Sequence, residues 1–252
     1  MTEQEALFNY CLRIGDTSLI AGHRLSEWCG HGPILEEDIA MTNIALDWVG
    51  QSRTMLQYAG EIEGKTRTED DFAYQRNERQ FYNALISELP NKDFAYTTAK
   101  NFFLSAFNFY FYQELKKSKD ETLAAFAEKS LKEVTYHLRH TSDWIIRLGD
   151  GTDESHQRLQ DAVNAIWQFT GDLFEMNDVD KLLIDKGIAV DLAMVKKHWE
   201  NKVKEVFAEA TLQLPQTIWM QSGSKKGVHT EYFGFLLSEM QYLPRTYPEA
   251  KW

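Results

Sequence analysis

Apolar residues recur every three or four positions along almost the whole chain, which is the spacing of one face of an α-helix. We find no convincing segment with the period of two that a half-buried strand requires. The pattern therefore predicts long helices, separated by breaks at glycine and proline. The expected helices cover Glu3–Trp28, Leu35–Gly60, Asp93–Lys117, Glu121–Leu148, Glu154–Phe174, Leu192–Val206 and Thr230–Tyr242, with a shorter connecting helix at Arg76–Leu89.

The helix expected at Asp93–Lys117 differs from the others because its centre, Phe102–Tyr112, is apolar on all sides. Such a helix is buried all round. The connections are short, with a loop at Glu69–Asp71 and an Asp/Lys-rich link after Phe174, and no Pro/Ser-rich linker divides the chain. We therefore predict one all-α domain over residues 1–252, a four-helix core with additional C-terminal helices.

Composition narrows the classes of function. The net charge of −11 argues against a nucleic-acid partner. The aromatic run Asn101–Tyr112 is too short to span a bilayer, and the N-terminus lacks the basic and apolar regions of a signal peptide. The two cysteines, Cys11 and Cys29, would lie about 27 Å apart on one helix, too far for a disulfide. We predict a reduced cytoplasmic protein without a membrane segment.

Several acids lie inside apolar runs, where a buried carboxylate needs a partner or a metal. Residues equally far from the turn of a helical hairpin lie at the same height. This rule places Asp47 level with Asp16 in the first hairpin. It places Glu133 and His137 of the second hairpin level with uncharged residues.

These four positions, Asp16, Asp47, Glu133 and His137, do not complete a known metal motif. A di-iron bundle needs a Glu on each of two helices and Glu-x-x-His on each of the other two. None of the seven histidines has a Glu three residues before it. We expect no metal and no catalytic residue, and predict that the acids pair inside the bundle, with Arg24 or Arg139 as candidate partners.

The loop before the last helix concentrates positive charge in an acidic chain. We expect Lys225, Lys226, Gly227 and His229 to bind a ligand or partner, because helix N-termini favour anions. The ligand would be the phosphates of a coenzyme A tail or an acidic protein surface, and a solvated loop is the alternative. Seven Trp and fifteen Phe further suggest that some aromatics lie at a subunit interface.

Motifs along the chain resemble those of the non-catalytic structural subunit of bacterial phenylacetyl-CoA epoxidase, also called ring 1,2-phenylacetyl-CoA monooxygenase. The resemblance extends over essentially the whole chain. The matching stretches are Arg24–His31, Asn43–Asp47 with Gly50-Gln51, Glu78–Phe81, Lys132-Glu133, Tyr136–Arg139, Gly149–Asp153, Lys225–Glu231 and Glu239–Leu243.

The resemblance implies a ferritin-like fold and a hetero-oligomer with a homologous catalytic subunit that holds the di-iron centre. The complex would use O2 and electrons from a separate reductase to epoxidise the ring of phenylacetyl-CoA. Structural subunits of this kind lack the iron ligands, in agreement with the absence of Glu-x-x-His from this sequence. Two other hypotheses stay open: an autonomous di-metal oxidase using the four degenerate positions, and a CoA-thioester-binding module using Lys225 and Lys226.

Overall fold

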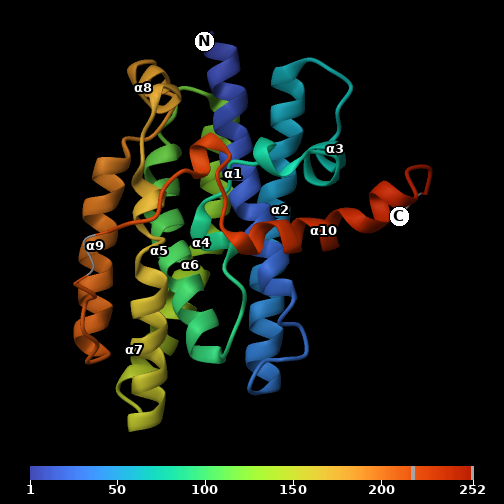
Figure 1. Ribbon diagram of the computed structural model, residues 1–252. Coiled ribbons are helices and arrows are strands. Elements are labelled where there is room, and N and C mark those ends of the chain that lie inside the picture. Colours follow the sequence, from blue (N-terminus) through green and yellow to red (C-terminus); the bar gives the residue numbers. More distant parts are fainter. Residues whose placement is uncertain (217–218, 251–252) are drawn as a thin grey trace.

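The computed structural model describes residues 1–216 and 219–250, and these form α-helices and short 3-10 helices without a strand (Figure 1). The fold is all-α and ferritin-like, as predicted. Two helical hairpins make its centre, and α2 packs against α6 between them. The four helices are α1 Glu3–Ser26, α2 Leu35–Glu63, α5 Phe94–Leu115 and α6 Glu121–Gly149.

The remaining helices pack around these hairpins. Two of them lie against α5, one lies against α1, and the last crosses the front of the molecule with its C-terminal end projecting to one side (Figure 1). They are α7 Asp153–Trp167 and α9 Leu192–Glu209, α8 Asp178–Asp185, and α10 Glu231–Thr246, which contacts α3 Glu69–Tyr74 and α4 Leu85–Glu88. No helix within the described residues is long and apolar enough to cross a membrane.

Polar residues just before the helices determine where the helices begin. Thr2 and Glu5 form a capping box at the start of α1. Asp93 caps α5 by accepting the N–H of Tyr96, and Asp120 caps α6 in the same way. Each cap satisfies a backbone N–H that the helix itself leaves unpaired.

Helix α5 is buried along nearly its whole length, which confirms the prediction made from its apolar centre. Phe102 and Phe103 are fully buried, and the ring of Phe207 of α9 stacks on Phe102 and lies tilted against Phe103. The indole N–H of Trp199 donates to the carbonyl of Phe103 at 3.0 Å. Helices α7 and α9 therefore pack on the second hairpin, against α5 and α6.

The predicted register of the second hairpin is correct. Tyr112 contacts Phe126 with 5.4 Å between ring centroids, and Phe94 contacts Trp144 at 4.9 Å. Both pairs lie equally far from Lys119, at the centre of a short turn. The height of Glu133 and of His137 in the bundle is therefore as expected.

The predicted register of the first hairpin is wrong. Gly22 of α1 lies against Trp48 and Val49 of α2, so Asp47 is level with a point about 10 Å further along α1 than Asp16. The loop after α1 is not a symmetric turn, because it folds back along the start of α2. There the N–H groups of Gly30 and Gly32 donate to Asp38 at 2.8 and 3.1 Å.

The helix predicted at Arg76–Leu89 is also wrong. A 3-10 helix at Glu78–Gln80 is followed by extended chain and then by the short α4. Side chains of α1 take the backbone hydrogen bonds that a helix would use, since Tyr82 N–H donates to Asp16 and Ala84 N–H donates to Thr17. The expected loop at Glu69–Asp71 is instead the start of α3, capped by Thr68.

Two further differences lie near the C-terminus. Helix α7 ends at Trp167, seven residues before the predicted end at Phe174, and a 3-10 helix covers Gly171–Phe174. The Asp/Lys-rich link contains α8, which Asn177 caps through a capping box. A single domain over residues 1–252 stays a prediction, and positions 217–218 and 251–252 lie outside the described residues.

Candidate functional site

Asp16 is fully buried, and its charge is balanced by one arginine. The guanidinium of Arg76 donates to both carboxylate oxygens of Asp16, and the N–H of Tyr82 donates to it at 2.9 Å. The expectation that Arg24 or Arg139 pairs with the buried acids is wrong for Asp16. Arg24 instead donates to backbone carbonyls and to a carboxylate at the end of α1.

Asp47 lies at the edge of the bundle and not inside it. Its side chain is 37% exposed, so the predicted burial is wrong. One carboxylate oxygen lies 2.8 Å from Nε2 of His137, which is fully buried and packs beside the indole of Trp48. Nδ1 of His137 is buried and has no hydrogen-bond partner among the described residues.

The carboxylate of Glu133 accepts a hydrogen bond from a side-chain amide. Nε2 of Gln51 donates to Glu133 at 2.8 Å, and the hydroxyl of Tyr112 donates to Oε1 of Gln51 at 3.0 Å. Burial raises the pKa of Tyr112, which keeps the hydroxyl protonated and able to donate. Gln51 therefore connects helices α2, α5 and α6 through side-chain hydrogen bonds.

These positions do not fit a pair of iron ions. Glu133 and His137 lie one turn apart on α6, but Asp47 and Asp16 are separated along the bundle axis. Each of the four side chains already bonds to a protein group. Within residues 1–216 and 219–250, no three or more His, Cys, Asp or Glu gather as they would around a metal.

The structure does not bring the loop residues together on one surface. Lys225 points inward and donates to Glu175 O and to Asp180, while Lys226 is exposed. Gly227 adopts a left-handed turn with φ of 66°. A side chain there would collide with the carbonyl of Arg79.

His229 is part of a buried cluster that attaches the last helix. Its Nδ1 lies 2.6 Å from Oε1 of Glu88, and both side chains are fully buried. Thr230 donates to the second oxygen of Glu88 with both its N–H and its hydroxyl, each at 2.7 Å. Asn83 adds a fourth donor at 2.9 Å. His229 is therefore placed as a structural residue at the start of α10.

The sequence prediction missed a buried lysine. Lys100 lies in α5 and donates to Leu89 O and to Asn91, both at 2.8 Å. Burial, together with the charge of Arg24 and against the opposing charge of Glu27, lowers the pKa of Lys100 to about 7. A lysine inside the run Ala99–Phe103 was the signal that could have found it.

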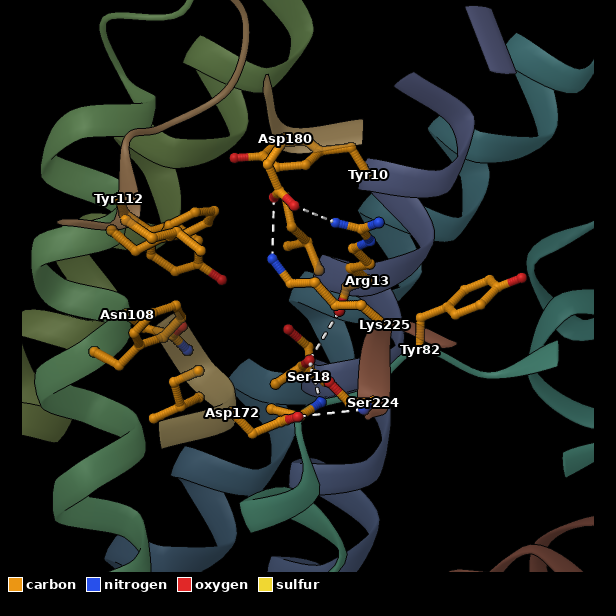
Figure 2. A pocket seen from close by; sticks show the side chains of 17 residues that line it. Tyr10, Arg13, Ser18, Tyr82, Asn108, Tyr112, Asp172, Asp180, Ser224 and Lys225 are labelled. Carbon is orange, nitrogen blue, oxygen red and sulfur yellow. Dashed lines mark hydrogen bonds and ion pairs between the residues drawn. The ribbon is translucent and has the colours of Figure 1, made fainter. Parts of the chain in front are cut away.

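The prediction also missed a cavity between α1 and α5, shown in Figure 2. Arg13, which interrupts an apolar run of α1, donates to Asp180 of α8 at 2.9 Å. Lys225 donates to the other oxygen of Asp180 at 3.0 Å. Burial tends to raise the pKa of Asp180, but the charges of Lys225 and Arg13 outweigh burial and lower it, so this carboxylate is ionised.

Two comparisons with known proteins give consistent matches. The family model described as phenylacetic acid catabolic protein matches residues 1–252. A curated relative is one of the subunits of 1,2-phenylacetyl-CoA epoxidase from Escherichia coli (strain K12). It is 46% identical over 243 residues, which cover 96% of this chain and 98% of the relative.

Proposed function

The chain belongs to the phenylacetic acid catabolic protein family, and from this premise we propose that it is the non-catalytic structural subunit of a phenylacetyl-CoA 1,2-epoxidase. In this proposal, a homologous catalytic subunit holds the di-iron centre, and the present chain stabilises that subunit in a cytoplasmic hetero-oligomer. The complex then acts in aerobic phenylacetate degradation. The name of the relative, and a similarity that covers nearly the full length of both proteins, support this assignment.

The observation that carries the non-catalytic role is the state of the four degenerate positions. Asp16 bonds to Arg76, Asp47 to His137 and Glu133 to Gln51. A carboxylate that already balances a buried arginine loses that balance if it turns toward a metal. The geometry therefore favours packing over iron binding at these residues.

An exposed apolar face of α2 supports the binding of a protein partner. Leu35, Ile39 and Leu46 are 70%, 51% and 63% exposed, and Val49 is 40% exposed. Tyr136 of the neighbouring α6 is 39% exposed as well. The four α2 residues follow the spacing of one helix face, and apolar side chains gathered on one face commonly mark an interaction site. We name this face, made of these five residues, the α2 apolar face.

Copurification tests the proposal. The tagged chain is co-expressed with the catalytic subunit, and the complex is isolated by gel filtration at micromolar concentration. We expect a stable complex, with iron in the catalytic subunit and less than about a tenth of an ion per copy of this chain. Leu46→Glu places a charge on the α2 apolar face and should weaken complex formation. Met194→Glu on α9, where Met194 is 50% exposed, is the matched control and should leave the complex intact.

Three outcomes would contradict the proposal. Clean separation of the two chains would remove the scaffold role. Near-stoichiometric iron or manganese in the isolated chain, lost in Asp47→Ala, would favour an autonomous oxidase. Binding of CoA by the isolated chain, weakened in Lys226→Ala, would favour a CoA-thioester module. A CoA contact at the subunit interface is compatible with the proposal and rests on Lys226, since Lys225 points inward.

A further inference from the structure

A cavity of about 70 Å³ lies between α1 and α5, below α8 and the turn that contains Lys225 (Figure 2). Its apolar wall includes Ile14 of α1 and Phe107 and Phe111 of α5. The rings of Phe107 and Phe111 stack with 5.5 Å between centroids. The cavity is separate from the degenerate metal positions, none of which contributes to its wall.

The polar part of the wall contains two basic side chains, Arg13 and Lys225, and two acidic ones, Asp172 and Asp180. Asp180 is the shared partner of Arg13 and Lys225 and neutralises only one of them. The other acid in the wall, Asp172, already accepts the N–H groups of Leu85 and Ser224. Burial raises the pKa of Asp172 and lowers the pKa of Lys225. A ligand carboxylate next to Lys225 would favour the charged form of this lysine.

Hydrogen-bond donors around the cavity also lack partners. The side chain of Asn108 is 4% exposed and points into the cavity (Figure 2), and we find no partner for its amide within the described residues. An ammonium group has three N–H donors. Lys225 uses one on Glu175 O and one on Asp180. Nε of Arg13 is buried and has no partner within the same residues.

We propose that this cavity binds a short-chain monocarboxylate, with its carboxylate between Asn108 and Lys225 and its alkyl group against Phe107 and Phe111. An anionic head with two acceptor oxygens matches the unused donors, and a short apolar tail matches the wall. An apolar cavity of about 150 Å³ holds benzene. The present cavity is about half as large and suits an acid of about two to four carbon atoms. This inference does not depend on the catalytic partner and goes beyond the proposed scaffold role.

The test is calorimetric titration of the full chain with sodium propionate, at constant ionic strength set with sodium chloride. We expect saturable binding of one propionate per chain. Asn108→Leu should weaken it about tenfold or more, because the amide donor is lost. Lys225→Met should weaken propionate binding more than Asn108→Leu does. Lys226→Met removes the exposed neighbouring charge and should leave propionate binding unchanged.

Several results would overturn the inference. Propionamide binding as tightly as propionate would show that the anionic head is not recognised. Tighter binding of phenylacetate than of propionate would show that the size limit is wrong. Absence of saturable propionate binding would leave a cavity that holds only water. Asn108→Leu keeps the contacts of Asp180, so it tests the site even if Lys225→Met fails to fold, which circular dichroism would reveal.

Discussion

The pairing of Arg76 with Asp16 predicts an asymmetric response to mutation. Arg76→Leu leaves a fully buried carboxylate with one remaining donor, the N–H of Tyr82. It also removes a donor from the carbonyls of Phe72 and Gln80. Removing one partner of a buried ion pair costs about 3–5 kcal/mol. That cost is a large part of the roughly 5–15 kcal/mol by which a folded protein is stable.

The opposite change should be milder. In Asp16→Asn the amide oxygen still accepts from Tyr82, and Arg76 keeps its carbonyl acceptors. The guanidinium also keeps its position over the ring of Phe81, 4.0 Å from the centroid. The buried guanidinium loses its counter-charge but keeps these acceptors and the ring face, so we expect a smaller loss of about 1–3 kcal/mol.

Urea unfolding followed by far-UV circular dichroism measures both free energies. The double variant Asp16→Asn with Arg76→Leu should lose less than the sum of the two single losses, because it no longer contains an unpaired buried charge. Arg76→Lys keeps the positive charge but loses the bidentate contact with Asp16. This variant provides a folded reference if Arg76→Leu does not fold. A loss below about 1 kcal/mol in Arg76→Leu, or strict additivity in the double variant, would refute the reasoning.

Two further predictions concern a titrating lysine and a strained turn. Burial lowers the pKa of Lys100 from 10.5 to about 7, so between these values the unfolded chain binds more protons and stability rises with pH. Lys100→Met should reduce that rise between pH of about 7 and 9 in urea unfolding, and an unchanged slope would contradict it. Gly227→Ala should lose at least about 2 kcal/mol, because φ is 66° and the added carbon would collide with Arg79 O. Gly64→Ala is the control, because Gly64 has a φ of 68° but open space around it, and this variant should lose about 1–2 kcal/mol. Equal losses of stability in Gly227→Ala and Gly64→Ala would exclude the clash.

Helix periodicity predicted most of the fold because helices such as α6 bury one clear stripe, and α5 was recognised instead from its uninterrupted apolar centre. The register of α5 and α6 followed from a short turn, as the contact between Tyr112 and Phe126 shows. The register of α1 and α2 did not follow, because the loop between them folds back onto Asp38. A count of residues from a turn is valid only if the turn is symmetric.

The sequence shows which metal-ligand motif the candidate site lacks, but it does not show which residues pair with the buried acids. The absence of Glu-x-x-His is visible in the sequence, and it is consistent with the protein partners found for Asp16, Asp47 and Glu133. Arg76 could be identified as the partner of Asp16 only with knowledge of the extended segment near residue 82. The backbone of that segment bonds to side chains that are distant in sequence. Pattern rules describe local periods and contain no information about such long-range bonds.

The attachment of the last helix has a consequence for synthesis on the ribosome. Glu88 and Asp172 are buried, and they accept hydrogen bonds from His229, Thr230 and Ser224, which the ribosome adds after α9. A nascent chain that has just completed α9 therefore has only part of the donors of these two acids, Asn83 for Glu88 and the N–H of Leu85 for Asp172. The packing around Glu88 and Asp172 can therefore be completed only after the chain has been synthesised past Thr230.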